Sequence, residues 1–137
     1  MPMTTTCFVL DTYAFMAFVR EEPTADEISN LFERAARNEI YLAISMINYG
    51  EICYIVERTM GLEAVEHVIV SLDATPIIIF QATRKRVLAA AHIKARYPLS
   101  YADAFAVALA QELQATVVTG DPEFHAVEHL VNVLWLK

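Results

Sequence analysis

The fold is indicated by residues 99–124, which read LSYADAFAVALAQELQATVVTGDPEF. Ser100 is a helix-capping type of residue, and it opens a predicted helix over 100–114. A predicted strand over 115–119 follows. After one glycine, the pair Asp121-Pro122 places a capping residue and a first-turn proline in succession, which is a strong helix start. A helix that leads into a short apolar strand and then into a new helix start is typical of α/β proteins.

The same alternation extends over the rest of the chain. We predict further strands at 7–10, 40–44, 75–80 and 131–135, and helices at 12–19, 24–38, 46–60, 62–72 and 82–96. Short apolar strands that alternate with helices indicate a parallel sheet covered on both faces. Because 137 residues are the size of one typical domain, we expect a single α/β domain over 1–137.

The composition limits where the protein is expected to act and which partners it is expected to bind. The apolar fraction is 56%, which is above the usual range and suggests apolar surface reserved for a partner. No apolar run approaches the roughly 20 residues of a membrane helix, and the N-terminus lacks the features of a signal peptide. We therefore expect a cytoplasmic protein that does not enter a membrane. Cys7 and Cys53 lie in apolar segments and are expected to be reduced core residues.

The net charge of −7 argues against a nucleic-acid-binding protein, because such proteins usually neutralise phosphates with basic residues. An acidic site that binds divalent cations partly answers this objection, since the metals reverse the local charge.

Four acids are expected at one edge of the predicted sheet. Asp11 follows the first strand directly, and Asp121 follows a later strand after one glycine. Crossover helices run antiparallel to the strands, so their first turns lie at the same edge. Glu51 lies about two turns into the helix over 46–60, and Asp103 lies in the first turn of the helix over 100–114.

A purely structural explanation competes for three of these acids. Asp11 and Asp121 can cap the helices that follow them, and Ser100 with Asp103 fits a capping box. Glu51 discriminates better, because Ile47, Tyr54 and Ile55 lie beside it at helical spacing. An acid on such an apolar stripe is costly unless it is compensated, and the competing account is an ion pair with Arg58.

The chemistry of such a cluster follows from its charge. Neighbouring carboxylates raise each other's pKa, and hard divalent cations relieve the repulsion. Mg²⁺ prefers oxygen ligands and often shares itself with substrate phosphates, and a bound metal activates water for attack on a phosphodiester. Thr119 and Ser100 offer hydroxyls beside the acids for orienting water, although capping and turn roles are the more common use of such residues.

Four strings resemble the acidic motifs of PIN domains, most closely those of VapC-type toxins from prokaryotic toxin–antitoxin pairs. They are VLDT at 9–12, NYGE at 48–51, LSYADA at 99–104 and VTGDPEF at 118–124. The resemblance spans almost the whole chain. By this resemblance, the acids that hold the metals correspond to Asp11, Glu51, Asp103 and Asp121, and Thr119 matches the hydroxyl residue that precedes the last acid. Gly120 departs from members that carry a polar or basic residue there.

The resemblance implies a three-layer α/β/α PIN-like fold with a central, mainly parallel sheet of about five strands. It implies an endoribonuclease that depends on Mg²⁺ or Mn²⁺ and cleaves RNA phosphodiesters. It also implies a homodimer and a small VapB-like antitoxin that covers the active-site groove. The alternatives are a non-catalytic binding module with the same fold, and a PIN nuclease of RNA processing or DNA-related function without an antitoxin.

Other folds and sites are disfavoured by specific residues. No glycine-rich turn follows the first strand, as a dinucleotide-binding fold requires. Tyr13 stands where a haloacid dehalogenase-type phosphatase has its second aspartate, and Phe80-Gln81 lacks the acid of a phosphorelay receiver. We interpret the basic patch over 84–86 as a solvated helix face, in preference to an RNA contact. We interpret His125 and His129 as surface residues, in preference to metal ligands.

Overall fold

A parallel β-sheet forms the centre of the protein in a computed structural model that describes residues 5–137. In these residues five strands are hydrogen-bonded in the order β3-β2-β1-β4-β5. Every pairing of neighbouring strands is parallel. The strands are β1 Cys7–Leu10, β2 Tyr41–Ser45, β3 Ile78–Phe80, β4 Thr116–Thr119 and β5 Asn132–Trp135. The predicted parallel sheet is confirmed.

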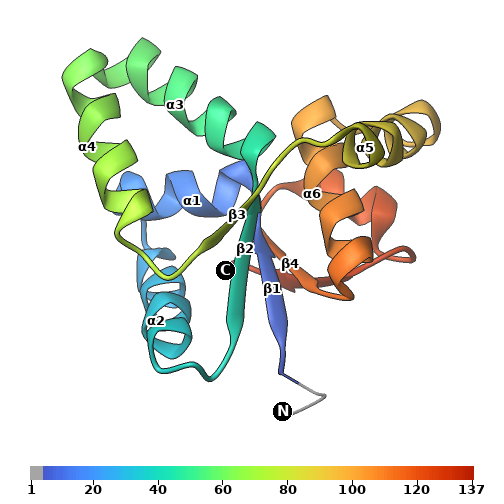
Figure 1. The fold of residues 1–137 in the computed structure, drawn as a ribbon, viewed down its shortest axis with the longest axis horizontal. Coiled ribbons are helices and arrows are strands. Elements are labelled where there is room, and N and C mark those ends of the chain that lie inside the picture. The colour runs from blue at the N-terminus through green and yellow to red at the C-terminus, as the bar shows by residue number, and fades with distance from the viewer. Residues whose placement is uncertain (1–4) are drawn as a thin grey trace.

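Helices cover both faces of this sheet and make the predicted three-layer arrangement (Figure 1). Helices α1 to α4 lie on one side, and α5 and α6 lie on the other. Their bounds are α1 Thr12–Val19, α2 Ala25–Ala36, α3 Met46–Met60, α4 Leu62–Asp73, α5 Arg84–Arg96 and α6 Tyr101–Leu113, with a short 3₁₀ helix, η1, at Pro122–Val127. The α/β/α fold predicted from the sequence is therefore the fold observed.

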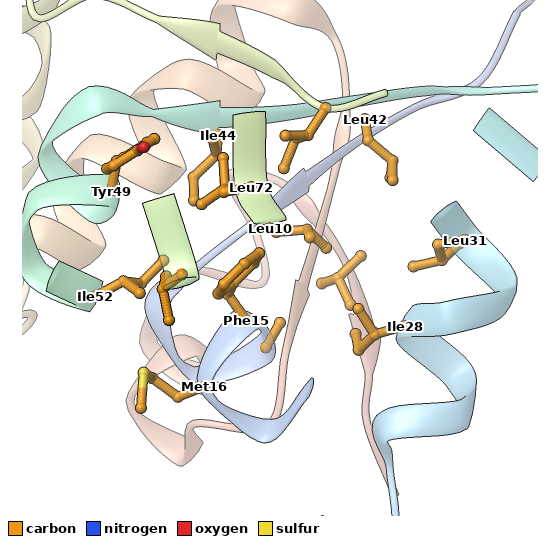
Figure 2. Close-up of a cluster of buried hydrophobic side chains, with 14 of the residues drawn as sticks. Leu10, Phe15, Met16, Ile28, Leu31, Leu42, Ile44, Tyr49, Ile52 and Leu72 are labelled. Atoms are coloured by element: carbon orange, nitrogen blue, oxygen red, sulfur yellow. The ribbon is translucent and has the colours of Figure 1, made fainter. Parts of the chain in front are cut away.

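The sheet buries side chains on both faces because strand side chains alternate in direction. On one face Leu10, Leu42 and Val118 join a core with α1 to α4, part of which Figure 2 shows. On the other face Val9 and Val117 join a second core with α5, α6 and η1. Burial on both faces explains why the central strands are continuous apolar runs.

Side-chain caps at the carboxyl edge of the sheet fix where the helices begin. Asp11 caps α1, Ser45 caps α3, Ser100 caps α6 and Asp121 caps η1. Each accepts a hydrogen bond from a backbone N–H two or three residues later, which satisfies one of the unpaired donors of a helix start. The predicted helix starts agree with these caps to within one residue or two.

The third strand is shorter than predicted. We expected it to begin at Thr75, whereas β3 begins at Ile78. Thr75 is instead held in a turn after α4, where its hydroxyl donates to the carbonyl of Leu72 at 2.7 Å. Pro76 has no N–H to donate to a sheet ladder, so the strand begins only after it.

Two further expectations concern the thiols and the membrane. Cys7 and Cys53 are half-buried, and neither forms a disulfide in the described part of the chain. Burial raises the pKa of both thiols. Within residues 5–137, no helix has the length and apolarity needed to cross a membrane. Residues 1–4, which belong to the segment where we expect no signal peptide, lie outside the described residues.

Candidate active site

Asp11 occupies the centre of the carboxyl edge. It follows β1 directly and is fully buried. Its Oδ1 accepts a hydrogen bond from the backbone N–H of Ala14 at 2.8 Å, and its Oδ2 accepts one from the hydroxyl of Thr119. Burial raises the pKa of Asp11 to about 8, against the opposing effect of these two hydrogen bonds, and the charges of Asp103 and Asp121 raise it further.

Asp103 and Asp121 approach each other from different elements. Asp103 lies in the first turn of α6, and Asp121 caps η1 after β4. Their carboxylates and that of Glu123 each offer an oxygen, and these oxygens all lie within 4.8 Å of one another. Burial, followed by the neighbouring charge of Asp121, raises the pKa of Asp103 to about 7. A cation between these groups would therefore compete with a proton.

Glu123 was not singled out from the sequence. It lies two residues after Asp121, and the backbone N–H of Glu123 donates to Oδ1 of Asp121 at 3.0 Å. An acid in the first turn of a helix is already explained by the helix dipole, so its presence after an Asp-Pro pair carried no separate signal. The tight turn between the two acids is what brings both carboxylates to the same place.

Glu51 lies in the same cleft but is not part of this closest group. It is half-buried in α3, where the hydroxyl of Tyr54 donates to its Oε2 at 3.3 Å. The predicted alternative partner, Arg58, instead lies over the ring of Tyr54, 5.3 Å from the ring centroid. Within residues 5–137 Glu51 forms no salt bridge. The competing account, in which an arginine neutralises Glu51, is therefore wrong.

The hydroxyls of Thr119 and Ser100 both form hydrogen bonds within the protein. Thr119 is fully buried, and its oxygen also accepts from the backbone N–H of Asp121 at 3.0 Å. Thr119 thus connects Asp11 with Asp121. The hydroxyl of Ser100 accepts from the backbone N–H of Asp103 at 3.1 Å. Both geometries are those of capping and turn residues, the alternative role weighed for them.

A cleft of about 370 Å³ opens over these acids. Its lining brings Glu51, Asp103, Asp121 and Glu123 together, while Asp11 lies buried beneath it. Among the described residues that line it, Arg20 at the end of α1 is the one basic side chain. The predicted acids therefore converge, although Asp11 is deeper and Glu51 more peripheral than the others.

The ring of Tyr13 lies against Gly120. A Cβ atom added to Gly120 would overlap the Tyr13 ring, with Cζ only 2.9 Å away. Tyr13 is 44% exposed and also lines the cleft. The tyrosine ring therefore takes the space in which a side chain at position 120 would otherwise stand.

The other candidate groups do not converge on the cleft. Arg86 forms a two-point ion pair with Glu112, with Nη2 and Oε2 at 2.9 Å, so it is not a free basic residue. His125 pairs with Glu128, and His129 contacts Tyr97. The interpretation of these residues as surface groups agrees with these contacts.

The chemistry of the acid group fits a hard divalent cation. Its donors are carboxylate oxygens, which are the ligands that Mg²⁺ and Mn²⁺ prefer. Asp11 and Asp103 are buried, and burial raises the pKa of both because it disfavours the charged carboxylate. A cation that binds these oxygens would compensate that charge.

The sequence between the first strand and the C-terminal segment matches one known family. The PIN domain family matches residues 8–130, which include the four predicted acids. The chain belongs to the PIN domain family. This membership agrees with the parallel sheet and the helices that flank it.

Solved structures of PIN proteins share the fold at low sequence identity. The VapBC2 structure from Rickettsia felis, bound to a DNA fragment from its promoter, has a TM-score of 0.75 at 16% identity over 96% of this chain and 100% of that chain. DNA-bound VapBC from Salmonella typhimurium has a TM-score of 0.74 at 18% identity, covering 97% and 100% of the two chains.

The description of a third similar structure names an activity. Mycobacterium tuberculosis VapC20, described as a toxin that cleaves the sarcin-ricin loop, has a TM-score of 0.71 at 17% identity over 88% of this chain and 94% of that chain. No curated protein sequence matches the chain. At these identities the structural likeness establishes the fold of this PIN domain.

Proposed function

We propose that this PIN domain is an endoribonuclease that depends on Mg²⁺ or Mn²⁺ and is the toxin of a VapBC-type toxin–antitoxin pair. One observation carries the proposal. Five acids from four separate segments of the sequence converge on the carboxyl edge of the sheet, where Asp103, Asp121 and Glu123 have carboxylate oxygens within 4.8 Å of one another. Uncompensated carboxylates at this spacing are unfavourable unless a proton or a cation joins them.

Each acid has a distinct place in the proposed site. We assign Asp103 and Asp121, with Glu123 beside them, as the primary cation ligands. Asp11 lies beneath them, and Glu51 closes the cleft from α3. A bound divalent cation would activate a water molecule for attack on the phosphodiester and offset the charge that develops on the phosphate.

The remaining residues orient the substrate and the acids. Thr119 holds the Asp11 carboxylate and positions the turn that carries Asp121. Arg20, on the wall of the cleft, offers a cation for a phosphate of the RNA strand that flanks the scissile bond. A single basic residue among many acids fits a site in which bound metals supply most of the attraction for RNA.

Partners of the proposed toxin follow from its PIN neighbours. Several of the similar structures are described as VapBC or toxin–antitoxin complexes, which supports a VapB-like antitoxin as the regulator of this chain. Exposed apolar side chains on α3 and α4, Tyr54, Met60, Leu62 and Val70, support a homodimer, which light scattering would test. RNA as the substrate implies action in the cytoplasm.

The test is cleavage of a labelled RNA with Mn²⁺, with Mg²⁺ and with EDTA. Wild-type protein should cleave only with a divalent cation, and Asp11→Asn and Glu51→Gln should each lose most of the activity. Glu57→Gln is a matched control, because Glu57 is an exposed acid on the same helix as Glu51. Cleavage that persists in Asp11→Asn at the wild-type rate would identify a contaminating nuclease and reject the proposal.

A further inference from the structure

Asn48 lies in α3 and contacts the starts of α1 and α6, next to two of the acids. It lies in the first turn of α3, one turn before Glu51, and is fully buried. Its Nδ2 donates to the hydroxyl oxygen of Thr12 at 3.0 Å and to the carbonyl of Ala102 at 3.3 Å. Thr12 directly follows Asp11, and Ala102 directly precedes Asp103.

The chemistry of the amide suits this position. The carbonyl oxygen of Ala102 can only accept a hydrogen bond, so the nitrogen of Asn48 has to face it. A neutral amide offers two donors without adding another negative charge to a site that already holds several. An aspartate of the same shape would offer no donor when ionised, and a leucine offers none at all.

The oxygen of the same amide is less well satisfied than its nitrogen. Oδ1 of Asn48 is buried and has no hydrogen-bond partner among the described residues. Leaving a buried acceptor unpaired is unfavourable for folding. The two donated bonds are therefore the feature that asparagine supplies here, and both of them run to neighbours of acidic residues.

We propose that Asn48 is a positioning residue that sets the spacing of Glu51 relative to Asp11 and Asp103, and thereby sets the affinity of the site for its cation. The second half of this statement rests on the proposed metal-dependent function. Asp11 at the cap of α1, Glu51 in α3 and Asp103 in α6 repel one another, and the contacts of Asn48 hold the starts of these three helices together.

Binding of Mn²⁺ to the purified chain without RNA tests the proposal. Asn48→Leu keeps the approximate shape of the side chain and removes both donors. We expect it to weaken Mn²⁺ binding by tenfold or more, measured by calorimetry or by the EPR signal of free Mn²⁺, and we expect high Mn²⁺ concentrations to restore RNA cleavage. Val56→Ala is the matched control, because Val56 is a fully buried residue of the same helix that belongs to the core.

The control separates positioning from general support of the fold. Val56→Ala should lower the melting temperature at least as much as Asn48→Leu while changing Mn²⁺ affinity less than twofold. Equal Mn²⁺ affinity of Asn48→Leu and wild type would overturn the proposal. So would a loss of affinity that follows the loss of melting temperature equally in both variants.

Hydrogen exchange of the metal-free protein decides the positioning claim independently of the proposed function. Asn48→Leu should speed amide exchange in the first turns of α3 and α6, whereas Val56→Ala should not do so at α6. If wild-type protein fails to bind Mn²⁺, the metal-dependent function is rejected, and the exchange result still decides whether Asn48 holds these helices together. Unchanged exchange in Asn48→Leu would overturn the positioning claim.

Discussion

The hydroxyl of Thr119 donates a hydrogen bond to Oδ2 of Asp11, and the two residues lie 108 positions apart in the sequence. Both are fully buried, at the ends of adjacent strands β1 and β4. The same hydroxyl oxygen accepts from the backbone N–H of Asp121. One small side chain thus links the deepest acid of the cleft to an acid on its wall.

Thr119→Val tests this link, because valine has nearly the same shape but no hydroxyl. Removal of the donor should raise the pKa of Asp11 further and leave the N–H of Asp121 without its acceptor. We expect a loss of about 1 to 3 kcal/mol in the free energy of unfolding, measured in urea with EDTA. The pH at which metal-dependent cleavage reaches half of its maximum should move upward.

Thr59→Val is the control for that variant. The hydroxyl of Thr59 donates to the carbonyl of Ile55 on the exposed side of α3. Its loss should change the free energy of unfolding by no more than about 0.5 kcal/mol. Similar destabilisation in the two variants would mean that the buried hydroxyl of Thr119 contributes no more to stability than the exposed hydroxyl of Thr59.

The stability of the metal-free protein should fall as the pH rises from about 5 to 8. In the folded state burial raises the pKa of Asp11 to about 8 and that of Asp103 to about 7, from 3.8 for an unperturbed aspartate. The folded chain therefore holds more protons than the unfolded chain in this range, so the free energy of unfolding decreases with pH. This contribution is complete below pH 4 and is lost through pH 7 to 8.

Melting temperatures in EDTA across this range measure the effect. Asp11→Asn should flatten the decline, whereas Glu57→Gln should leave it unchanged. Mg²⁺ should raise the melting temperature more at pH 8 than at pH 5, since at low pH protons compete for the same oxygens. A melting temperature that rises steadily from pH 5 to 8 in EDTA would contradict the assigned directions.

Glu51 and Arg58 should behave independently, because the arginine lies over Tyr54 and forms no ion pair with the acid. Glu51→Gln should weaken Mn²⁺ binding by more than tenfold, measured by calorimetry. Arg58→Gln should leave Mn²⁺ affinity unchanged and cost little stability, as is usual for exposed charges. A comparable change in Mn²⁺ affinity in both variants would restore the ion-pair account.

Arg20→Gln should weaken RNA binding more than it slows the chemical step. A lost phosphate contact is expected to raise KM by about tenfold, which corresponds to roughly 1.4 kcal/mol, with a smaller change in kcat. The slope of log affinity against log salt for a single strand should decrease by about 0.7. Arg37→Gln, which removes an exposed arginine paired with Glu39 outside the cleft lining, should change neither quantity.

The fold was largely predictable because each central strand is a short apolar run with a capping residue close behind it. The cap at Asp11 and the Asp121-Pro122 pair marked both the helix starts and the positions of two acids. The convergence of the acids followed from topology alone, since parallel strands end at one edge. These signals depend on residue type and spacing, which the sequence states directly.

Side-chain orientation was the part that spacing left open. Spacing placed Tyr54 on an apolar stripe beside Glu51, but Tyr54 is half exposed and its hydroxyl donates to Glu51. Arg58 had two possible partners at helical spacing, and only the packing of α3 selects the ring of Tyr54. Glu123 joins the acids because of a tight turn after Asp121, and a first-turn acid is common without any such role.

The contact between the Tyr13 ring and Gly120 has a consequence for the evolution of this branch of the family. A side chain at position 120 would require the exposed Tyr13 ring to turn away from its present place, so the two positions should covary among homologues. Lineages with a bulkier residue at 120 should carry a smaller one at 13. A lysine introduced at 120 should displace the Tyr13 ring in the present sequence but not in a Tyr13→Ala background, so the effect of each mutation would depend on whether the other arose first.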